Sequence, residues 1–149
     1  METITYLPKY KNDFIRLNRF WIQKYFKLES EDILAFEHIE DILENEGQIF
    51  FALKEAVVIG TIALKNKGNS VGELCKFAVD ESAQGLGVGH ILMEKLITYA
   101  RSKHYISLFL EGNTKLSSSI HLYEKFGFIA LPDFKSAYER VDIVMELHL

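Results

Sequence analysis

Apolar side chains in the first part of the chain recur at every third or fourth position, which is the spacing of one face of a helix. We therefore predict a helix over residues 7–28, after a short strand at residues 4–7. A second helix is predicted to begin with Ser30 as its N-cap, because two acidic residues follow at the positive end of the helix dipole. Gly47 is expected to end this helix.

After residue 47 the pattern changes to short runs of β-branched and apolar residues, which are typical of strands. The later elements are predicted as strands at 48–54, 57–65 and 71–79, a helix at 88–100, a strand at 107–110, a short helix that starts at 117–119 and ends before Gly127, and strands at 128–131 and 141–147. The order is β-α-α-β-β-β-α-β-α-β-β. It predicts an α/β fold with a mixed sheet and a βαβ unit across residues 71–110.

Length and charge narrow the classes of protein. A chain of 149 residues with 48% hydrophobic residues fits one domain over 1–149. The net charge of −4, without a basic patch, argues against a nucleic-acid partner. A lone cysteine, Cys75, excludes an internal disulfide, and no histidines have metal-ligand spacing, so we expect no metal. Together with the lack of a long apolar stretch in residues 1–10, this predicts a cytoplasmic protein without membrane contact.

A glycine-rich loop follows the strand that ends near Val79 and leads into the 88–100 helix. It reads Gln84-Gly85-Leu86-Gly87-Val88-Gly89. Peptide N–H groups at a helix start are unpaired and carry partial positive charge, and glycines let a phosphate approach the backbone closely. The loop therefore predicts a pyrophosphate site made by the N–H groups of roughly Leu86 to His90.

Three other interpretations of this loop compete. A Walker loop requires Lys followed by Ser or Thr at its end, where this chain has His90-Ile91. A dinucleotide fingerprint gains support from Gly85-x-Gly87 after a strand and from Glu111 at the end of the next strand. However, His90 takes the place of its third glycine, and only one βαβ unit is present. The remaining interpretation is a glycine-rich turn without a ligand.

Two motifs together resemble the GCN5-related N-acetyltransferase superfamily. The glycine loop fits its signature Gln/Arg-x-x-Gly-x-Gly/Ala, and Leu122-Tyr123-Glu124-Lys125-Phe126-Gly127-Phe128 matches a second signature at the end of a short helix. The match is clear over 73–128, and the order of elements agrees over the whole chain. The resemblance implies an acyl-CoA acyltransferase fold with splayed central strands, acetyl-CoA as cosubstrate and an amine as acceptor.

The resemblance also implies where acetyl-CoA binds. Pantetheine is expected in the gap between the strand that ends at Val79 and the strand around Leu108, with the backbone of Phe77, Ala78 and Val79 pairing with its amides. The Phe77 N–H is expected to polarise the thioester carbonyl. The loop from Gln84 to His90 is expected to hold the pyrophosphate.

Tyr123 and Glu73 are the catalytic candidates. Tyr123 matches the family tyrosine that gives a proton to the departing thiolate, which is reasonable because a phenol titrates near 10 and a thiol near 8.5. Its alternative role is that of a packed aromatic residue. Glu73 resembles the base glutamate of the histone-acetylating branch, and burial is expected to raise its pKa. Its alternative is a solvated glutamate at a strand edge, with ordered water as the base.

The chain departs from the family pattern after the 107–110 strand. The family often places an asparagine seven residues before the tyrosine, where this chain has Leu116. Asn113 lies ten residues before it and is expected to contact the cofactor from the strand end. Ser119 supplies the small residue of the following helix and is compatible with close approach of the cofactor.

The acceptor is the least defined partner. Eight acidic residues in 29–46 either attract a cationic acceptor or form a solvated helix face. Arg140 either binds a substrate carboxylate or makes a surface ion pair. We expect a small or amino-acid-like amine, with a protein lysine or N-terminal acetyltransferase, or a non-catalytic acyl-CoA-binding module, as alternatives. The 141–147 strand edge permits a homodimer.

Overall fold

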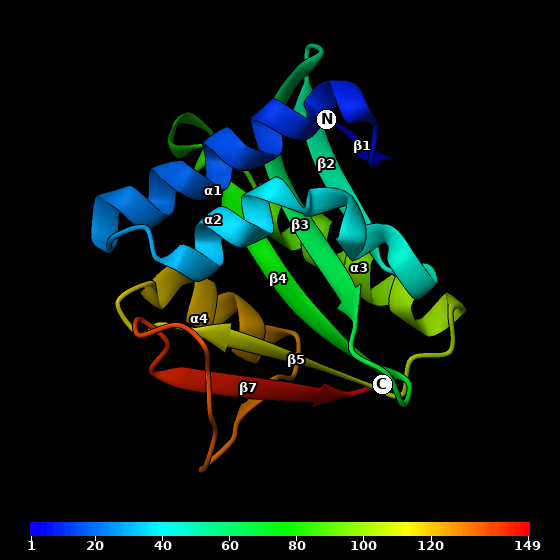
Figure 1. Cartoon of the computed structure of the whole chain (residues 1–149). Helices are drawn as coiled ribbons and strands as arrows, with labels where there is room; N and C mark the ends of the chain where they lie inside the picture. Colours follow the sequence, from blue (N-terminus) through cyan, green and yellow to red (C-terminus); the bar gives the residue numbers. More distant parts are fainter.

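The computed structural model describes residues 1–149 and is organised around one seven-stranded sheet (Figure 1). The strands lie in the order β1-β2-β3-β4-β5-β7-β6. Their bounds are β1 Glu2–Thr5, β2 Gln48–Lys54, β3 Val57–Asn66, β4 Val71–Val79, β5 Ser107–Gly112, β6 Ile129–Ala130 and β7 Ile143–His148. Neighbouring strands are antiparallel except β4 and β5, which are parallel. The predicted mixed sheet and βαβ unit are therefore confirmed.

The helices agree with the prediction in number and order, but their starts and ends differ. Their bounds are α1 Lys11–Tyr25, α2 Ser30–Glu37, α3 Val88–Ser102 and α4 Ser117–Lys125, with 3-10 segments at Pro8–Tyr10 (η1), Ile39–Glu46 (η2) and Glu81–Ala83 (η3). The first helix was predicted to begin at residue 7, but Pro8 begins a separate 3-10 turn. No helix of the structure is long and apolar enough to cross a membrane.

The second predicted helix is wrong in its cap and in its length. Glu29, not Ser30, is the N-cap, because its side chain accepts from the backbone at Asp32 while the Asp32 carboxylate accepts from the Glu29 N–H at 2.9 Å. The α-helix then ends at Glu37, and a 3-10 segment with a left-handed residue, Asn45, completes the connection to β2. The apolar spacing is the same in both helix types over so short a stretch, so the pattern did not reveal the break.

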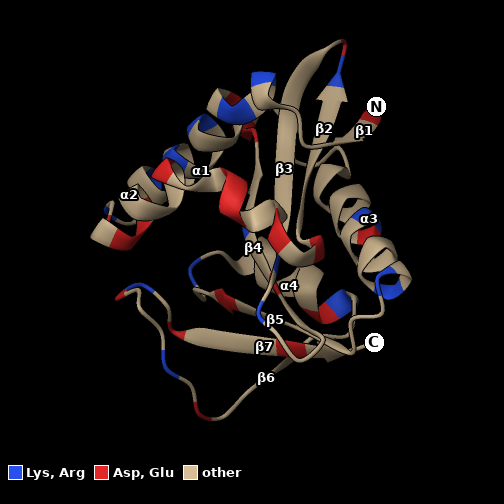
Figure 2. Cartoon of the chain, turned by 45° about the vertical axis from the view of Figure 1, so that its right-hand side comes forward, with Lys and Arg blue, Asp and Glu red and all other residues tan.

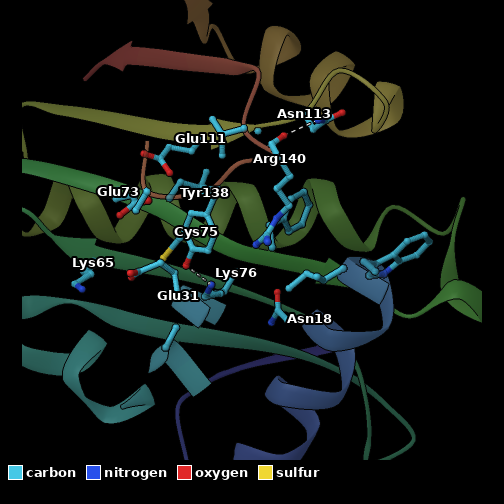
Figure 3. A pocket seen from close by; sticks show the side chains of 18 of the residues that line it. Asn18, Glu31, Lys65, Glu73, Cys75, Lys76, Glu111, Asn113, Tyr138 and Arg140 are labelled. Carbon is cyan, nitrogen blue, oxygen red and sulfur yellow. Dashed lines mark hydrogen bonds between the residues drawn. The ribbon is translucent and has the colours of Figure 1, made fainter. Parts of the chain in front are cut away.

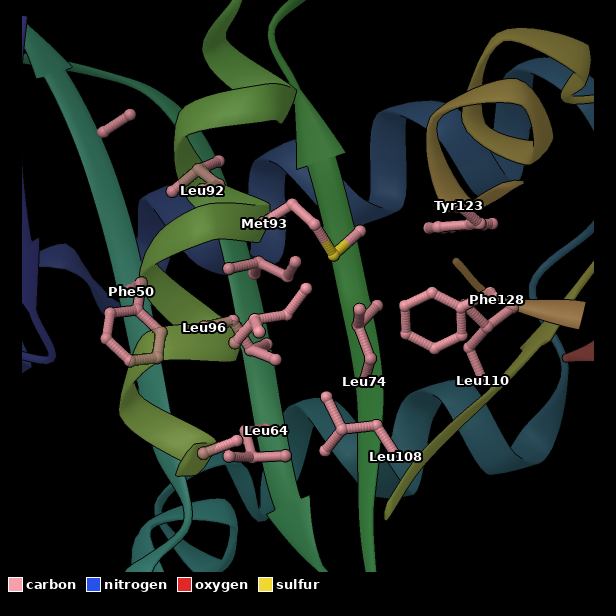
Figure 4. Packing of buried hydrophobic residues seen from close by; sticks show 14 of the residues in the cluster. Phe50, Leu64, Leu74, Leu92, Met93, Leu96, Leu108, Leu110, Tyr123 and Phe128 are labelled. Carbon is pink, nitrogen blue, oxygen red and sulfur yellow. The ribbon is translucent and has the colours of Figure 1, made fainter. Parts of the chain in front are cut away.

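The sheet separates two hydrophobic cores. Side chains of α3, α4 and the sheet form the larger core on one face (Figure 4). The helix α1 and the η2 segment cover the other face, where Phe14, Leu17, Ile39 and Ile42 pack on the strands. Figure 1 shows α1 and α2 in front of the sheet and α3 behind it. Any residue in β4 therefore faces one layer or the other according to its place in the strand's alternation.

A β-bulge in β4 changes that alternation. Thr61 and Ala63 of β3 pair with Ala78 and Cys75, so the single residue between them faces two residues of β4. Before the bulge, Leu74 packs in the α3 core and Cys75 against the α1 core; beyond it, Phe77 packs on the α3 side. The extra residue brings the end of β4 into a new orientation at the place where β4 also leaves β5.

β4 and β5 pair only over their first halves. The parallel ladder joins residues 71–74 to residues 107–110 and stops there. Residues 75, 78 and 79 of β4 still pair with β3, but no strand pairs with residues 75–79 on the other side. Their outward N–H and C=O groups therefore border a gap in the middle of the sheet.

Candidate functional site

Two cavities meet at the gap between β4 and β5. One has a volume of about 620 Å³ and is bordered by the end of β4, the glycine loop and the start of α4; we call it the glycine-loop cavity. The other has a volume of about 520 Å³ and lies between β4, β5, α2 and the segment before β7; we call it the α2-side cavity. Both are lined by Trp21, Phe77, Leu116 and Ser119. The two cavities are therefore adjacent to each other.

The glycine loop leaves its backbone open to the first cavity. Gly85 and Gly87 have φ values of +80° and +78°, which side chains rarely allow, and a Cβ at either position would meet no atom within 4 Å. Gly87 is the N-cap of α3 and provides no side-chain acceptor, and the first turn of α3 has no acidic residue. The first N–H groups of α3 therefore face open space with the positive end of the helix dipole behind them. A pyrophosphate fits this arrangement.

Gly89, Leu86 and His90 complete the loop whose backbone N–H groups are predicted to bind pyrophosphate. A Cβ on Gly89 would lie 2.9 Å from the Phe77 ring, so Gly89 allows helix-to-strand packing rather than phosphate approach. Leu86 is exposed and does not line the cavity. His90 pairs with Glu94 at 2.6 Å and does not line the cavity either. Only the backbone of Leu86 and His90 remains available to a ligand.

At the end of β4, one backbone group already makes hydrogen bonds within the protein. The Val79 carbonyl accepts from the indole N–H of Trp21 at 2.8 Å and from the side-chain amide of Gln84 at 3.2 Å. This carbonyl therefore already accepts two hydrogen bonds, and pairing of the Val79 backbone with pantetheine stays a prediction. The Gln84 side chain holds the loop against the strand, and Gln84 also lines the glycine-loop cavity. The unpaired edge of Phe77 and Ala78 still borders the cavity.

Tyr123 stands where the two cavities join. It is 8% exposed, it lines the α2-side cavity, and its ring centroid lies 6.1 Å from that of Phe77. Burial raises the pKa of the Tyr123 phenol above its ordinary value, and a hydrogen bond with Ser119 only partly opposes this. The phenol is therefore protonated at neutral pH and available as a proton donor. Ser119, one helical turn earlier, is the small residue of α4 that borders both cavities.

Two carboxyl groups enter the α2-side cavity from neighbouring strands, Glu73 from β4 and Glu111 from β5 (Figure 3). The Glu73 side chain is 18% exposed, with the Lys67 ammonium 4.0 Å away. Burial raises the pKa of Glu73; Lys67 opposes this, and the Glu111 carboxylate adds to it. Glu73 is therefore a half-buried carboxylate of raised basicity inside the cavity, rather than a solvated residue at a strand edge.

Cys75 also lines this cavity, and burial raises the pKa of its thiol to about 12. A thiol that remains protonated at neutral pH is a poor nucleophile. Cys75 packs against the α1 core. No group of three or more His, Cys, Asp or Glu side chains is arranged to hold a metal ion.

The segment before β7 is fastened across the cavity by Arg140. Its guanidinium donates to both oxygens of Asp32, at 2.6 and 2.7 Å, and to Glu29 at 3.1 Å. Asp32 is fully buried; burial alone would raise its pKa, but the hydrogen bonds from Arg140 and from the Glu29 N–H lower it. Arg140 thus makes the predicted ion pair, although its side chain is 17% exposed rather than at the surface.

Asn113 supports the same segment. Its side-chain N–H donates to the Arg140 carbonyl at 2.6 Å, and its oxygen accepts from the Lys115 N–H at 2.8 Å. Both ends of the amide are therefore used by the protein, and Asn113 lines the α2-side cavity, not the glycine-loop cavity. The second N–H of the amide has no partner in the protein, and a cofactor contact at Asn113 stays a prediction.

Sequence reasoning missed three lining residues. Trp21 was assigned only to a helix face, but its indole contacts the end of β4 and both cavities. Lys76 and Tyr138 point into the α2-side cavity (Figure 3). A tryptophan in a helix and a lysine within an apolar strand are unusual, and this is the signal that the sequence contains. The contact partners of these residues come from distant segments, which a single sequence does not reveal.

Comparisons with known proteins agree with this geometry. The model of the acetyltransferase (GNAT) family matches residues 14–128. The chain is 34% identical over 89 residues to N-acetylaspartate synthetase of Xenopus tropicalis, which is 58% of this chain and 32% of the relative. It is 30% identical over 105 residues to streptothricin acetyltransferase A of Bacillus subtilis, or 70% of this chain and 59% of the relative. The matched part thus spans less than two thirds of either relative.

Solved structures share the fold over nearly the whole chain. An acetyltransferase of the GNAT family from Staphylococcus aureus Mu50 aligns with a TM-score of 0.88 at 23% identity, covering 99% of this chain and 98% of that one. The ribosomal-protein-alanine N-acetyltransferase from Brucella melitensis aligns with 0.81 at 18% identity over 100% of both chains. A Salmonella typhimurium structure with its cofactor acetyl-CoA gives 0.76 at 16% identity, covering 99% and 93%.

Proposed function

Because the chain belongs to the acetyltransferase (GNAT) family, we propose that it moves an acetyl group from acetyl-CoA to a primary amine of a small molecule or amino-acid-like substrate. The observation that carries this proposal is the end of the β4–β5 ladder after four residue pairs. There the glycine-loop cavity and the α2-side cavity meet beside Phe77 and Tyr123. Cosubstrate and acceptor can approach this gap from two adjacent cavities.

The glycine-loop cavity is proposed to hold acetyl-CoA, which supplies an acetyl group activated as a thioester. The open N–H groups that follow Gly87 bind the pyrophosphate. The free strand edge at Phe77 and Ala78 pairs with the pantetheine arm, as a missing strand would. The Phe77 N–H then lies close to the thioester carbonyl and stabilises the oxyanion as the amine attacks.

Two side chains are proposed to handle the protons. Glu73, with its raised pKa, takes a proton from the amine so that the nitrogen lone pair can attack the thioester carbon. As the new C–N bond forms and the C–S bond breaks, the protonated Tyr123 phenol gives its proton to the departing sulfur. The phenol regains a proton from solvent. Glu111 keeps the local negative potential that maintains the basicity of Glu73.

The α2-side cavity suits a small acceptor. Its volume of about 520 Å³ is within the range of small-molecule sites. The segment that carries Arg140 crosses the cavity and is fastened to α2 through Asp32, which narrows the room for an extended peptide. The name of one relative, N-acetylaspartate synthetase, refers to an acetylated amino acid. These points favour a small amine over a protein substrate.

A thiol-release assay tests the proposal. The chain is incubated with acetyl-CoA and a panel of amino acids, polyamines, aminoglycosides and lysine peptides, and the acylated product is identified by mass. We expect turnover with at least one small amine, and a rise in melting temperature with acetyl-CoA alone. No melting shift at saturating acetyl-CoA, together with no turnover, would contradict the proposal. A shift without any turnover would favour a non-catalytic acyl-CoA-binding module.

A further inference from the structure

Lys76 is an unusual residue at the centre of the α2-side cavity. It lies in the bulge of β4 and has a φ of +52°, a backbone conformation that residues other than glycine rarely adopt. In a regular strand, Lys76 would share the face of Leu74 and point into the α3 core. The bulge instead turns its side chain toward Phe36 of α2 and Tyr138.

The ammonium of Lys76 has no anionic partner in the protein. Its nitrogen lies 5.9 Å from the centre of the Phe36 ring, 5.4 Å from that of Tyr138, and 3.4 Å from the Tyr138 hydroxyl (Figure 3). No carboxylate oxygen lies within 4.0 Å of it, unlike the neighbouring Lys67 and Arg140. Two aromatic faces hold the charge in place but contribute only weakly, so the ammonium keeps most of its capacity to bind an anion.

Asp32, one of the acids near Lys76, already has hydrogen-bond partners for both of its oxygens. Asp32 lies close enough for the Lys76 charge to lower its pKa, but its two oxygens accept from Arg140 and from the Glu29 N–H. From the sequence, Arg140 was a candidate for binding a substrate carboxylate. In the structure its guanidinium instead donates hydrogen bonds to Asp32. The free cation of the cavity wall closest to the joint with the glycine-loop cavity is Lys76, the residue next to Phe77.

We propose that Lys76 binds a carboxylate of the acceptor, so that the substrates of this protein are amines that also carry an acidic group. The inference rests on the proposed function. In this arrangement the acid group sits on the Lys76 ammonium near the rings of Tyr138 and Phe36. The amine lies toward Glu73 and Glu111, on the same cavity wall. A zwitterionic molecule therefore matches both ends of the site.

The charges around the α2-side cavity also make a polyamine a less suitable acceptor than an amine with a carboxylate. Acidic side chains are concentrated on α2 and η2, which contain no lysine or arginine (Figure 2). Of these acids, Glu31 and Asp41 line the cavity and are exposed to solvent, where screening weakens their attraction for a cation. Lys76 is half-buried, so its repulsion of a second ammonium is screened less. A substrate with two positive charges is therefore disfavoured at the β4 bulge.

Matched substrates test the inference. Each amino acid of the panel is compared with its carboxamide, which keeps the amine and the shape but removes the negative charge. We expect kcat/KM about 10- to 100-fold higher for the acid, mainly through KM, as for a hydrogen bond to a charged group. The lower amine pKa of a carboxamide would by itself favour the carboxamide, so a preference for the acid has to come from the site.

The variant Lys76→Met is then measured with both members of a pair. It should lose the preference for the acid while kcat/KM for the carboxamide changes less than threefold, and Lys76→Arg should restore part of the preference. Lys95→Met, on the exposed side of α3, serves as the control with the same loss of charge. The inference would be overturned if Lys76→Met lowered kcat/KM equally for both substrates, or if the wild type had the same kcat/KM for the acid and the carboxamide. Either result would leave the proposed acetyl transfer unaffected. Failure to acetylate any amine would overturn the proposed function and the inference together.

Discussion

The two cavities beside β4 are built from different parts of the chain. The glycine-loop cavity presents mainly backbone groups: the free edge of Phe77 and Ala78, and N–H groups at the start of α3. The α2-side cavity presents charged and aromatic side chains from α1, α2, β4, β5 and the segment before β7. The first needs glycine and little else, whereas the second depends on the identity of each side chain. Changes that affect one cavity should therefore leave the other largely unchanged.

The largest effect is expected at the joint of the two cavities. Tyr123→Phe removes the proton donor, so kcat should fall by about 10²- to 10⁴-fold, the usual contribution of general acid catalysis. The KM for acetyl-CoA should change little, because the ring and its contact with Phe77 remain. Steady-state kinetics measure both values. Tyr99→Phe, which removes a hydroxyl bonded to the Glu46 carbonyl far from the site, is the control and should keep wild-type kcat.

Next in size is the loss of the buried ion pair that closes the α2-side cavity. Asp32→Asn leaves the Arg140 guanidinium without its counter-charge and weakens the cap of α2, so the free energy of unfolding should fall by about 3 kcal/mol. Urea titration measures it. Glu37→Gln, an exposed change in the same helix, should have almost no effect.

The pH dependence of stability gives a second readout for Asp32. Its pKa is lower in the folded chain than in the unfolded chain, so its contribution is complete above the ordinary value of about 3.9 and is lost as pH falls through the folded value. The variant should therefore show less loss of stability in acid than the wild type. Parallel curves for the two proteins would mean that the ion pair contributes nothing.

A smaller effect concerns the proton acceptor on the α2 side. Burial raises the pKa of Glu73, so kcat/KM should fall as pH drops, with a midpoint above the ordinary glutamate value of about 4.3. Glu73→Gln should remove this limb and lower kcat/KM about 10- to 100-fold at neutral pH. Glu111→Gln removes a neighbouring negative charge and should move the limb to lower pH. If kcat/KM of Glu73→Gln still fell at low pH with the same midpoint, the base would be a water molecule rather than Glu73.

The smallest effect is expected at the glycine loop. Gly87→Ala places a Cβ at a φ of +78° and costs about 1 kcal/mol of backbone strain, so the KM for acetyl-CoA should rise about fivefold. The KM for the acceptor should not change. Gly89→Ala makes a useful contrast, because its Cβ would press on the Phe77 ring at 2.9 Å and disturb both cavities. Equal responses of the two KM values to Gly87→Ala would contradict the separation of the cavities.

The same contrast explains what the sequence could predict. The strand, glycine loop and helix from 71 to 102 follow each other along the chain, so local pattern was sufficient to predict the backbone side of the site. Glu73 and Tyr123 could be proposed because they stand in or near recognisable motifs, and the structure brings both to the α2-side cavity. The sequence did not reveal that distant partners, Arg140 and Trp21, hydrogen-bond to Asn113 and to the Val79 carbonyl.

The acceptor side was largely out of reach for a single sequence. Asp32 reads as an ordinary acid near a helix start, and only the fold brings it to Arg140, 108 residues later. Lys76 reads as a polar residue in a strand that alternates irregularly. The direction of the Lys76 side chain depends on the β-bulge. The bulge arises from the pairing of β4 with β3, which the identity of residue 76 does not indicate. Side-chain constellations assembled from separate segments leave no periodic signal.

The account depends most on acetyl-CoA occupying the glycine-loop side of the gap, and amide hydrogen exchange with and without CoA tests this directly. We predict protection of the amides of residues 77–79, 85–90 and 117–119, with no change at residues 29–37 or 138–142. Protection of the α2 side, or no protection around Gly87 at saturating CoA, would contradict it.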